Sequence, residues 1–224
     1  MELREYLSIR RAYNLVRQEQ STDYRLTFAE FAILCRLQVA GGSLKTSDIA
    51  EYQGSLRPTM THRTKHLSKL GLIERLKGDI DKRNVVCKIT EEGSACAARL
   101  CRETCGKISV GQALARISPE RMCKYVDAMG SINCMAGELI VLGLWLGGED
   151  GRSITELVDD LGLLQPTVSM SVASLGDNGI VERMDGQPGR TGRVLLTEKG
   201  MAIADEINAQ ISGLIIRRRL RTKQ

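Results

Sequence analysis

Apolar residues recur along this chain at intervals of three and four, which is the spacing of amphipathic helices. In the first half this pattern, with its capping residues and glycines, predicts helices over residues 2–20, 28–39, 48–53, 56–70 and 91–114. Two short apolar runs, 72–75 and 85–89, predict strands on either side of a charged loop, 77–84. The predicted order is a series of helices, one hairpin and a long helix.

The second half predicts the same order of elements. A helix over 119–146, broken or bent near Gly130 or Gly137, precedes helices over 155–161 and 164–177. Strands over 180–183 and 194–196 flank a loop, 185–193, and a closing helix, 198–219, runs into a basic tail. Two helices followed by a hairpin with a charged loop are the elements of a winged helix-turn-helix.

The two halves also repeat in sequence. Residues 44–75 align without a gap with residues 152–183, at an offset of 108 residues. The identical pairs include Gly54 and Gly162, Pro58 and Pro166, Leu67 and Leu175, and Gly71 and Gly179. A repeat of this length is a domain, because solenoid repeats have periods of about 20–50 residues. We therefore expect a mainly α fold with small β-hairpin wings (α+β): two tandem winged helix-turn-helix domains, residues 1–117 and 118–224, packed through long flanking helices.

Charge divides unevenly between these halves. Residues 1–117 hold 20 Lys and Arg against 13 Asp and Glu, whereas residues 118–224 hold 12 against 14. A basic half beside an acidic one suggests that only one half meets a polyanion strongly. The seven cysteines lack the spacing of a disulfide framework, and no signal peptide or membrane span is apparent, so we expect a cytoplasmic protein with free thiols.

The first repeat, TSDIAEYQGSLRPTMTHRTKHLSKLGLIER and then DIDKRNVVCKITEEG, resembles the MarR family of bacterial transcription regulators. The shared elements are Pro-Thr near the start of the recognition helix, GLIER before the wing, Asp-x-Arg in the wing, and TEEG or TEKG opening the next helix. Most members are single winged-helix chains that dimerise. A tandem copy is similar to the two-repeat staphylococcal accessory regulator (Sar) group, in which one chain imitates a dimer.

The recognition helix of the first repeat has a strongly basic face. At about 100° per residue its packed stripe is Leu56, Met60, Thr64 and Leu67, with Ser55 as the expected cap. The candidate DNA-contacting residues are Ser55, Arg57, Pro58, Thr59, Thr61, His62, Arg63, Lys65, His66 and Lys69. Such side chains suit phosphates and base edges in the major groove. A solvated basic face is the alternative, but its place in the motif favours DNA contact.

The second repeat keeps the packed stripe and loses the cations. Nothing between Leu164 and Asn178 is basic, and Met170, Ala173 and Asp177 lie on the outward face. Only small polar residues remain that suit bases or phosphates. We name Gln165, Thr167 and Ser169 as its candidate contacts. We expect this copy to read DNA less strongly than the first.

The wings differ in the same direction. Lys82 and Arg83 belong to the first wing, and the resemblance implies that this arginine reaches the minor groove. The second wing lacks the aspartate of the family's pattern but keeps Arg190 and Arg193 as candidate phosphate contacts. The basic tail, residues 217–223, is either a phosphate-binding extension or a solvated end.

Two further groups of residues carry weaker signals. His62 and His66 have the i, i+4 spacing of a metal pair, but nothing on the same helix completes a ligand set, so DNA contact is the better interpretation. Cys96, Cys101 and Cys105 share one helix near arginines, which allows an oxidant sensor, although small buried side chains are the simpler interpretation. We expect no metal site, no cofactor and no enzyme activity, because the chain contains no catalytic motif.

The sequence therefore predicts a sequence-specific, double-stranded DNA-binding regulator that acts as a single-chain pseudo-dimer. The alternative is a winged-helix protein–protein interaction module in a DNA-associated assembly. The resemblance allows a small-molecule effector, but no residue identifies one. The chain can act as a monomeric pseudo-dimer or as a homodimer, and we expect no membrane partner.

Overall fold

The computed structural model describes residues 1–77, 85–184 and 192–216, and its first half follows the predicted order closely. The elements are α1 (Leu3–Glu19), the 3-10 helix η1 (Thr22–Tyr24), α2 (Phe28–Val39), β1 (Ser43–Lys45), α3 (Thr46–Tyr52), α4 (Arg57–Lys69), β2 (Ile73–Lys77), β3 (Val85–Ile89) and α5 (Glu91–Gly106).

The second half has a matching series of elements. They are α6 (Pro119–Met129), α7 (Ala136–Gly147), the 3-10 helix η2 (Gly148–Asp150), α8 (Ile154–Leu161), α9 (Gln165–Asp177), β4 (Val181–Met184), β5 (Arg193–Leu196) and α10 (Glu198–Ser212). The fold is thus mainly helical with small antiparallel sheets, consistent with a winged helix-turn-helix. Among the described residues, no helix combines the length and the apolar character needed to cross a membrane.

Both sheets are small and antiparallel. In the first, β3 lies between β1 and β2, with Leu44 opposite Cys87 and Arg75 opposite the same residue on the other side. In the second, β4 pairs with β5, and a single bridge between Arg152 and Val194 stands where β1 stands in the first. The sequence did not predict β1, because its three residues are too few to show a period of two.

The predicted ends of two helices were wrong, those of 91–114 and 198–219. The helix predicted over 91–114 ends at Gly106, and Leu114 has a φ of +69°, which lies outside the helical region. The break predicted in the helix over 119–146 is confirmed near Gly130, because the chain leaves α6 at Gly130 and α7 begins after its N-cap, Met135. The closing helix, predicted to reach residue 219, ends at Ser212.

The repeated Thr-Glu-x-Gly motif has a shared structural role. Thr90 accepts a hydrogen bond from the backbone N–H of Gly93 and donates one to the carbonyl of Gly71, which fastens the start of α5 to the hairpin. Thr197 makes the corresponding bonds to Gly200 and Gly179 at the start of α10. A Cβ on Gly93 would lie 1.9 Å from the Leu72 carbonyl oxygen, so only glycine permits this close packing.

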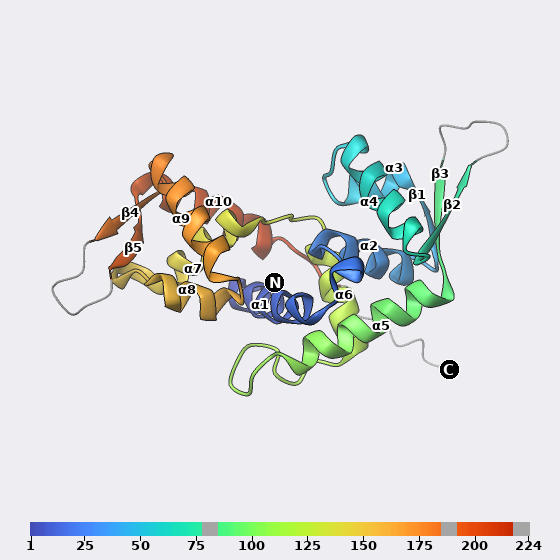
Figure 1. Cartoon of the computed structure of the whole chain (residues 1–224), viewed down its shortest axis with the longest axis horizontal. Coiled ribbons are helices and arrows are strands. Elements are labelled where there is room, and N and C mark those ends of the chain that lie inside the picture. Colours follow the sequence, from blue (N-terminus) through green and yellow to red (C-terminus); the bar gives the residue numbers. More distant parts are fainter. Residues whose placement is uncertain (78–84, 185–191, 217–224) are drawn as a thin grey trace.

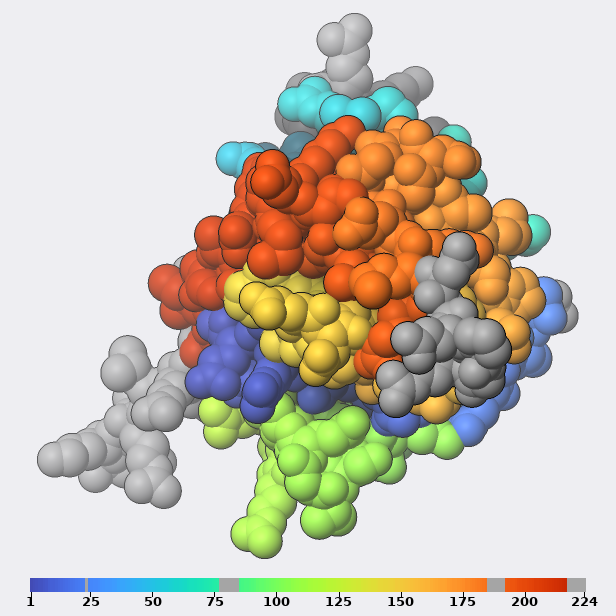
Figure 2. All heavy atoms as spheres, turned by 90° about the vertical axis from the view of Figure 1, so that its left-hand side faces the viewer, coloured from blue at the N-terminus to red at the C-terminus, as the bar shows by residue number. Residues whose placement is uncertain are grey.

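The two hairpins lie at opposite ends of an elongated molecule. In Figure 1, α3, α4 and the first sheet lie at one end, α8, α9 and the second sheet lie at the other, and α1, α2, α5 and α6 lie between them. Seen from the end that carries the second half, α1 (blue) lies between α7 (yellow) and the green part of the chain at α5 (Figure 2). Buried side chains from Leu3 to Ile211 join in one hydrophobic core.

Helix α1 fastens the two halves together through the end of α8. Arg11 donates to the Asp159 carbonyl at 2.7 Å, Asn14 to the Leu161 carbonyl at 2.9 Å, and Gln18 to the Gly162 carbonyl at 2.7 Å. The last carbonyls of a helix have no partner within the helix, so these side chains supply the missing donors. The second half contacts the first in turn, since its helix α6 packs against α2 and α5.

This arrangement predicts that Asn14→Ala combined with Gln18→Ala destabilises the chain. Each lost hydrogen bond removes about 0.5–1.5 kcal/mol, so we expect the free energy of unfolding in urea to fall by about 1–3 kcal/mol. The double variant should also separate the unfolding of the two halves into two transitions. Gln210→Ala, on the exposed face of α10, is the control. A loss no larger than that of the control would show that α1 does not join the halves.

Candidate nucleic-acid interface

Helix α4 presents one face to the core and the opposite face to solvent. Met60, Thr64 and Leu67 are buried, as predicted, and the helix packs against α2, α3 and β2. The exposed residues are Arg57, Pro58, Thr59, His62, Lys65 and Lys69. Leu56 is an exception to the predicted stripe, because it precedes the first helical residue as the N-cap and is 77% exposed. The exposed face therefore carries three permanent cations and one histidine.

Two candidate DNA contacts on α4 are instead paired within the protein. The Arg63 guanidinium donates to the Ser55 hydroxyl at 3.0 Å, and His66 Nδ1 lies 2.6 Å from Glu30 Oε1 on α2. Ser55 is therefore not the N-cap that we predicted, since its hydroxyl accepts from Arg63 instead. Burial lowers the pKa of Arg63, and the Glu30 carboxylate acts in the opposite direction. These pairs attach α4 to α2 and to the turn that contains Ser55. Thr61, the remaining candidate DNA contact on α4, is half-buried.

The first wing lies at the same end of the molecule as α4. Strands β2 and β3 pair from Ile73 with Ile89 to Lys77 with Val85, so the hairpin projects beyond α4 (Figure 1). Lys82 and Arg83 lie outside the described residues, so their DNA contacts stay predictions.

Helix α9 has the same position in the second half but different chemistry. Val168 and Val172 are buried, whereas Leu164, predicted to be packed, is 53% exposed at the N-cap. Gln165 is exposed, and Thr167 and Ser169 are half-buried. The outward residues Met170, Ala173 and Asp177 are exposed, so this face is apolar and weakly acidic where the α4 face is basic.

One of the two candidate arginines of the second wing makes its hydrogen bonds within the protein. Arg193 donates to the backbone carbonyls of Asp150 at 2.6 Å and Gly151 at 3.2 Å, and it lies 3.5 Å from the Glu156 carboxylate. These contacts fix the base of the β4–β5 hairpin to the turn before α8. A phosphate would have to compete with them. Arg190 and the basic tail, 217–223, lie outside the described residues.

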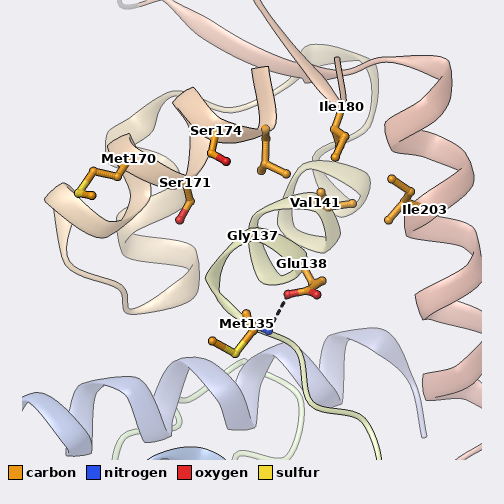
Figure 3. Close-up of a pocket in the computed structure, with 10 residues that line it drawn as sticks. Met135, Gly137, Glu138, Val141, Met170, Ser171, Ser174, Ile180 and Ile203 are labelled. Carbon is orange, nitrogen blue, oxygen red and sulfur yellow. Dashed lines mark hydrogen bonds between the residues drawn. The ribbon is translucent and has the colours of Figure 1, made fainter. Parts of the chain in front are cut away.

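An apolar pocket of about 520 Å³ lies behind α9. Figure 3 shows Glu138 and Val141 of α7, Ser171 and Ser174 of α9, and Ile203 of α10 around one space. At the offset of 108 residues, Ser171 and Ser174 correspond to Arg63 and His66, and Glu138 corresponds to Glu30. The serines are much shorter than the paired arginine and histidine, which leaves room between α7 and α9. Glu138 places a carboxylate on the wall, where it accepts from the Met135 N–H at 2.7 Å.

The cysteines of α5 do not have the low pKa that an oxidant sensor needs. Burial raises the pKa of Cys96 and of Cys105, and a hydrogen bond to Cys123 raises that of Cys101. The lowered pKa belongs to Cys123 on α6, a residue that the sequence did not single out. Cys123 lies near Cys101 only because α5 and α6 pack together, which no spacing along the chain reveals.

Comparison with known proteins finds similarity for part of the chain. Residues 26–85 match the model of the MarR family. Over 60 residues the chain is 40% identical to the HTH-type transcriptional regulator FarR of Neisseria gonorrhoeae, a stretch that covers 27% of this chain and 41% of that protein. The chain therefore spans less than half the length of this curated relative.

Solved structures give weaker matches. The YusO protein from Bacillus subtilis is 21% identical, with 54% of this chain and 79% of that chain covered and a TM-score of 0.38. BpsR of Bordetella bronchiseptica, solved to explain how 6-hydroxynicotinic acid regulates its DNA binding, is 21% identical, with 46% and 75% covered and a TM-score of 0.36. The stretch that matches the family model begins just before α2 and ends at the first residue of β3, so it contains α2, β1, α3, α4 and β2.

Proposed function

We propose that this chain is a transcriptional regulator that binds double-stranded DNA in a sequence-specific manner, with α4 as its main reading helix. The observation that carries the proposal is the exposed row of Arg57, Lys65 and Lys69 on α4, opposite its buried face. In a helix-turn-helix this face enters the major groove, where Arg and Lys contact phosphates and guanine. The MarR-family match of residues 26–85 supports the same assignment.

We also propose that the two halves, residues 1–117 and 118–224, act as an asymmetric pseudo-dimer similar to the two-repeat Sar proteins. The matching order of elements in the two halves supports this proposal. The contacts between the halves also support it, since α1 of the first half packs on α8, and α6 of the second half packs on α2 and α5. In this arrangement α9 takes the place of a second reading helix. Because it lacks cations, it contributes a weaker half-site contact than α4 does.

The salt dependence of DNA binding tests the first proposal. Each phosphate neutralised by a cation contributes a slope of about −0.9 to the plot of log K against log salt concentration. The three exposed cations of α4, together with the wing, predict a slope steeper than about −2.5. Fluorescence anisotropy on a labelled duplex at several salt concentrations measures it. Binding that is absent, or that does not change with salt, would contradict the proposal.

A protein–protein interaction module is the second candidate function, and it concerns the second half. Met170 is 74% exposed and Met184 58% exposed, and both lie on the α9 and β4 side that corresponds to the DNA-reading side of the first half. Exposed apolar side chains of this kind favour a protein partner over a polyanion. The basic face of α4 argues against this function for the whole chain.

The pocket behind α9 is where we place a small-molecule effector. Its apolar walls and the Glu138 carboxylate favour a small hydrophobic amine. Ser174→Leu would fill the space between α7 and α9, so amines that raise the melting temperature of the wild-type protein should not stabilise this variant. Ala173→Leu, at an exposed position that does not line the pocket, is the matched control. Equal stabilisation of both variants by the same amines would rule out this pocket.

A further inference from the structure

Three cysteine thiols from three helices converge at one place beside the junction of the two halves. Cys35 lies on α2, Cys101 on α5 and Cys123 on α6, and their three Sγ atoms all lie within 4.8 Å of one another. The three helices pack against one another between the two ends of the molecule (Figure 1). The residues are far apart in sequence, so only the fold brings them together.

We propose that Cys35, Cys101 and Cys123 form a binding site for one thiophilic metal ion of the Zn²⁺ and Cd²⁺ class. A Zn–S bond of about 2.3 Å places two thiolates of a tetrahedral site about 3.8 Å apart. Sulfur atoms that already lie within 4.8 Å of one another reach that spacing through shifts of about 1 Å. On binding, three metal–sulfur bonds form and the thiol protons leave to water.

The three thiols interact with one another. Hydrogen bonds from Cys101 and Cys35 lower the pKa of the Cys123 thiol, and Lys124 acts in the same direction. Burial raises the pKa of Cys35 well above its usual value. A cation of charge +2 can displace the thiol protons, because thiolates rather than thiols are metal ligands.

The cluster reaches solvent through Cys123. Cys35 and Cys101 are buried, whereas Cys123 is half-buried and lines a cleft of about 970 Å³. Two acidic and two basic residues line the same cleft, Glu120, Asp127, Arg36 and Lys124, and Asp127 pairs with Arg36 at 3.5 Å. An ion entering from the cleft meets Cys123 first, and its fourth coordination position faces the cleft, where water can occupy it.

The corresponding positions in the other half of the chain carry no cysteine. At the offsets that relate the two halves, Cys35 corresponds to Gly143, Cys101 to Asn208 and Cys123 to Leu15. The pseudo-symmetric place in the fold is therefore built without a thiol. An ion held here would join α6 of the second half to α2 and α5 of the first, and so would fix how the two halves are placed. This consequence rests on the proposed pseudo-dimer, but the ion site itself does not.

The test is titration of the fully reduced full-length chain with Cd²⁺, followed by the ultraviolet thiolate-to-cadmium charge-transfer absorption and by native mass spectrometry. We expect one tightly bound Cd²⁺ per chain, and Cd²⁺ should displace Zn²⁺ from the same site. Cys123→Ala should weaken Cd²⁺ binding at least 100-fold. Cys96→Ala and Cys105→Ala, which remove half-buried thiols of α5 outside the cluster, should bind as the wild type does.

The wild-type titration decides the proposal even if a variant fails to fold. A reduced wild-type chain that binds no Cd²⁺ at stoichiometric concentration overturns it, and so does Cd²⁺ binding that Cys105→Ala weakens as much as Cys123→Ala does. No DNA is present in this experiment. Its failure would leave the proposed DNA interface on α4 untouched, and a failure of DNA binding would leave the metal site untouched.

Discussion

Replacing Lys65 and Lys69 together by alanine is expected to weaken binding to double-stranded DNA about 100-fold at physiological salt. Both side chains are exposed on the outward face of α4 and pack against nothing in the core. Loss of about 1.4 kcal/mol for each phosphate contact corresponds to tenfold per lysine. The slope of log K against log salt should also become shallower by about 1.8, since two phosphates are no longer neutralised. Anisotropy titrations at several salt concentrations measure both changes.

The matched change on α9 should have a small effect. Gln165→Ala combined with Ser169→Ala removes two polar side chains from the corresponding helix, which carries no cation. We expect a loss of less than about fivefold and an unchanged salt slope. Circular dichroism should show that both double variants remain folded, because all four side chains are exposed or half-buried. Equal losses in the two variants would refute the asymmetry between the halves.

The second large effect is expected from Gly93→Ala, which should lower the free energy of unfolding by about 3 kcal/mol or more. A Cβ at this position would lie 1.9 Å from the Leu72 carbonyl oxygen and 2.9 Å from its carbonyl carbon. Both atoms are backbone, so relief of the clash requires α5 to move away from the hairpin. That movement would also disturb the Thr90 cap and the wing that β2 and β3 form. Urea unfolding at equilibrium measures the loss.

The same substitution at the other end of α5 serves as the control. Gly106 has nothing within 4 Å of its would-be Cβ and no positive φ, so Gly106→Ala should leave stability unchanged or raise it by about 0.5–1 kcal/mol. Gly200→Ala, where the Cβ would lie 2.2 Å from the Ile180 carbonyl oxygen, should resemble Gly93→Ala. If Gly93→Ala were as mild as Gly106→Ala, the close contact between α5 and the hairpin would not exist as described.

The repeated residues made much of the fold predictable from the sequence. Gly71 and Gly179 both adopt positive φ at the end of a helix, and Thr90 and Thr197 both cap the helix after the hairpin. Each has a local physical reason to be where it is, and so the pattern predicts the helix, the turn and the cap together. The buried Met60, Thr64 and Leu67 follow from helical spacing in the same way.

What the sequence could not predict depends on contacts between distant segments. The pairing of His66 with Glu30 turns an expected DNA contact partly inward, and the bonds of Arg193 to Asp150 and Gly151 do the same for the second wing. Both pairings join residues more than 30 positions apart. The cluster of Cys35 with Cys101 and Cys123 is of the same kind, since three helices have to pack before the thiols meet.

The most direct test of the account is to select binding sites from a random duplex library with the purified chain and to footprint the chain on the selected site. We predict a non-palindromic site bound by one chain, with one half-site strongly protected and specified by α4. The neighbouring half-site, about one helical turn away, should be weakly protected by α9. A palindromic site with two equally specified half-sites, or no enriched site at all, would contradict it.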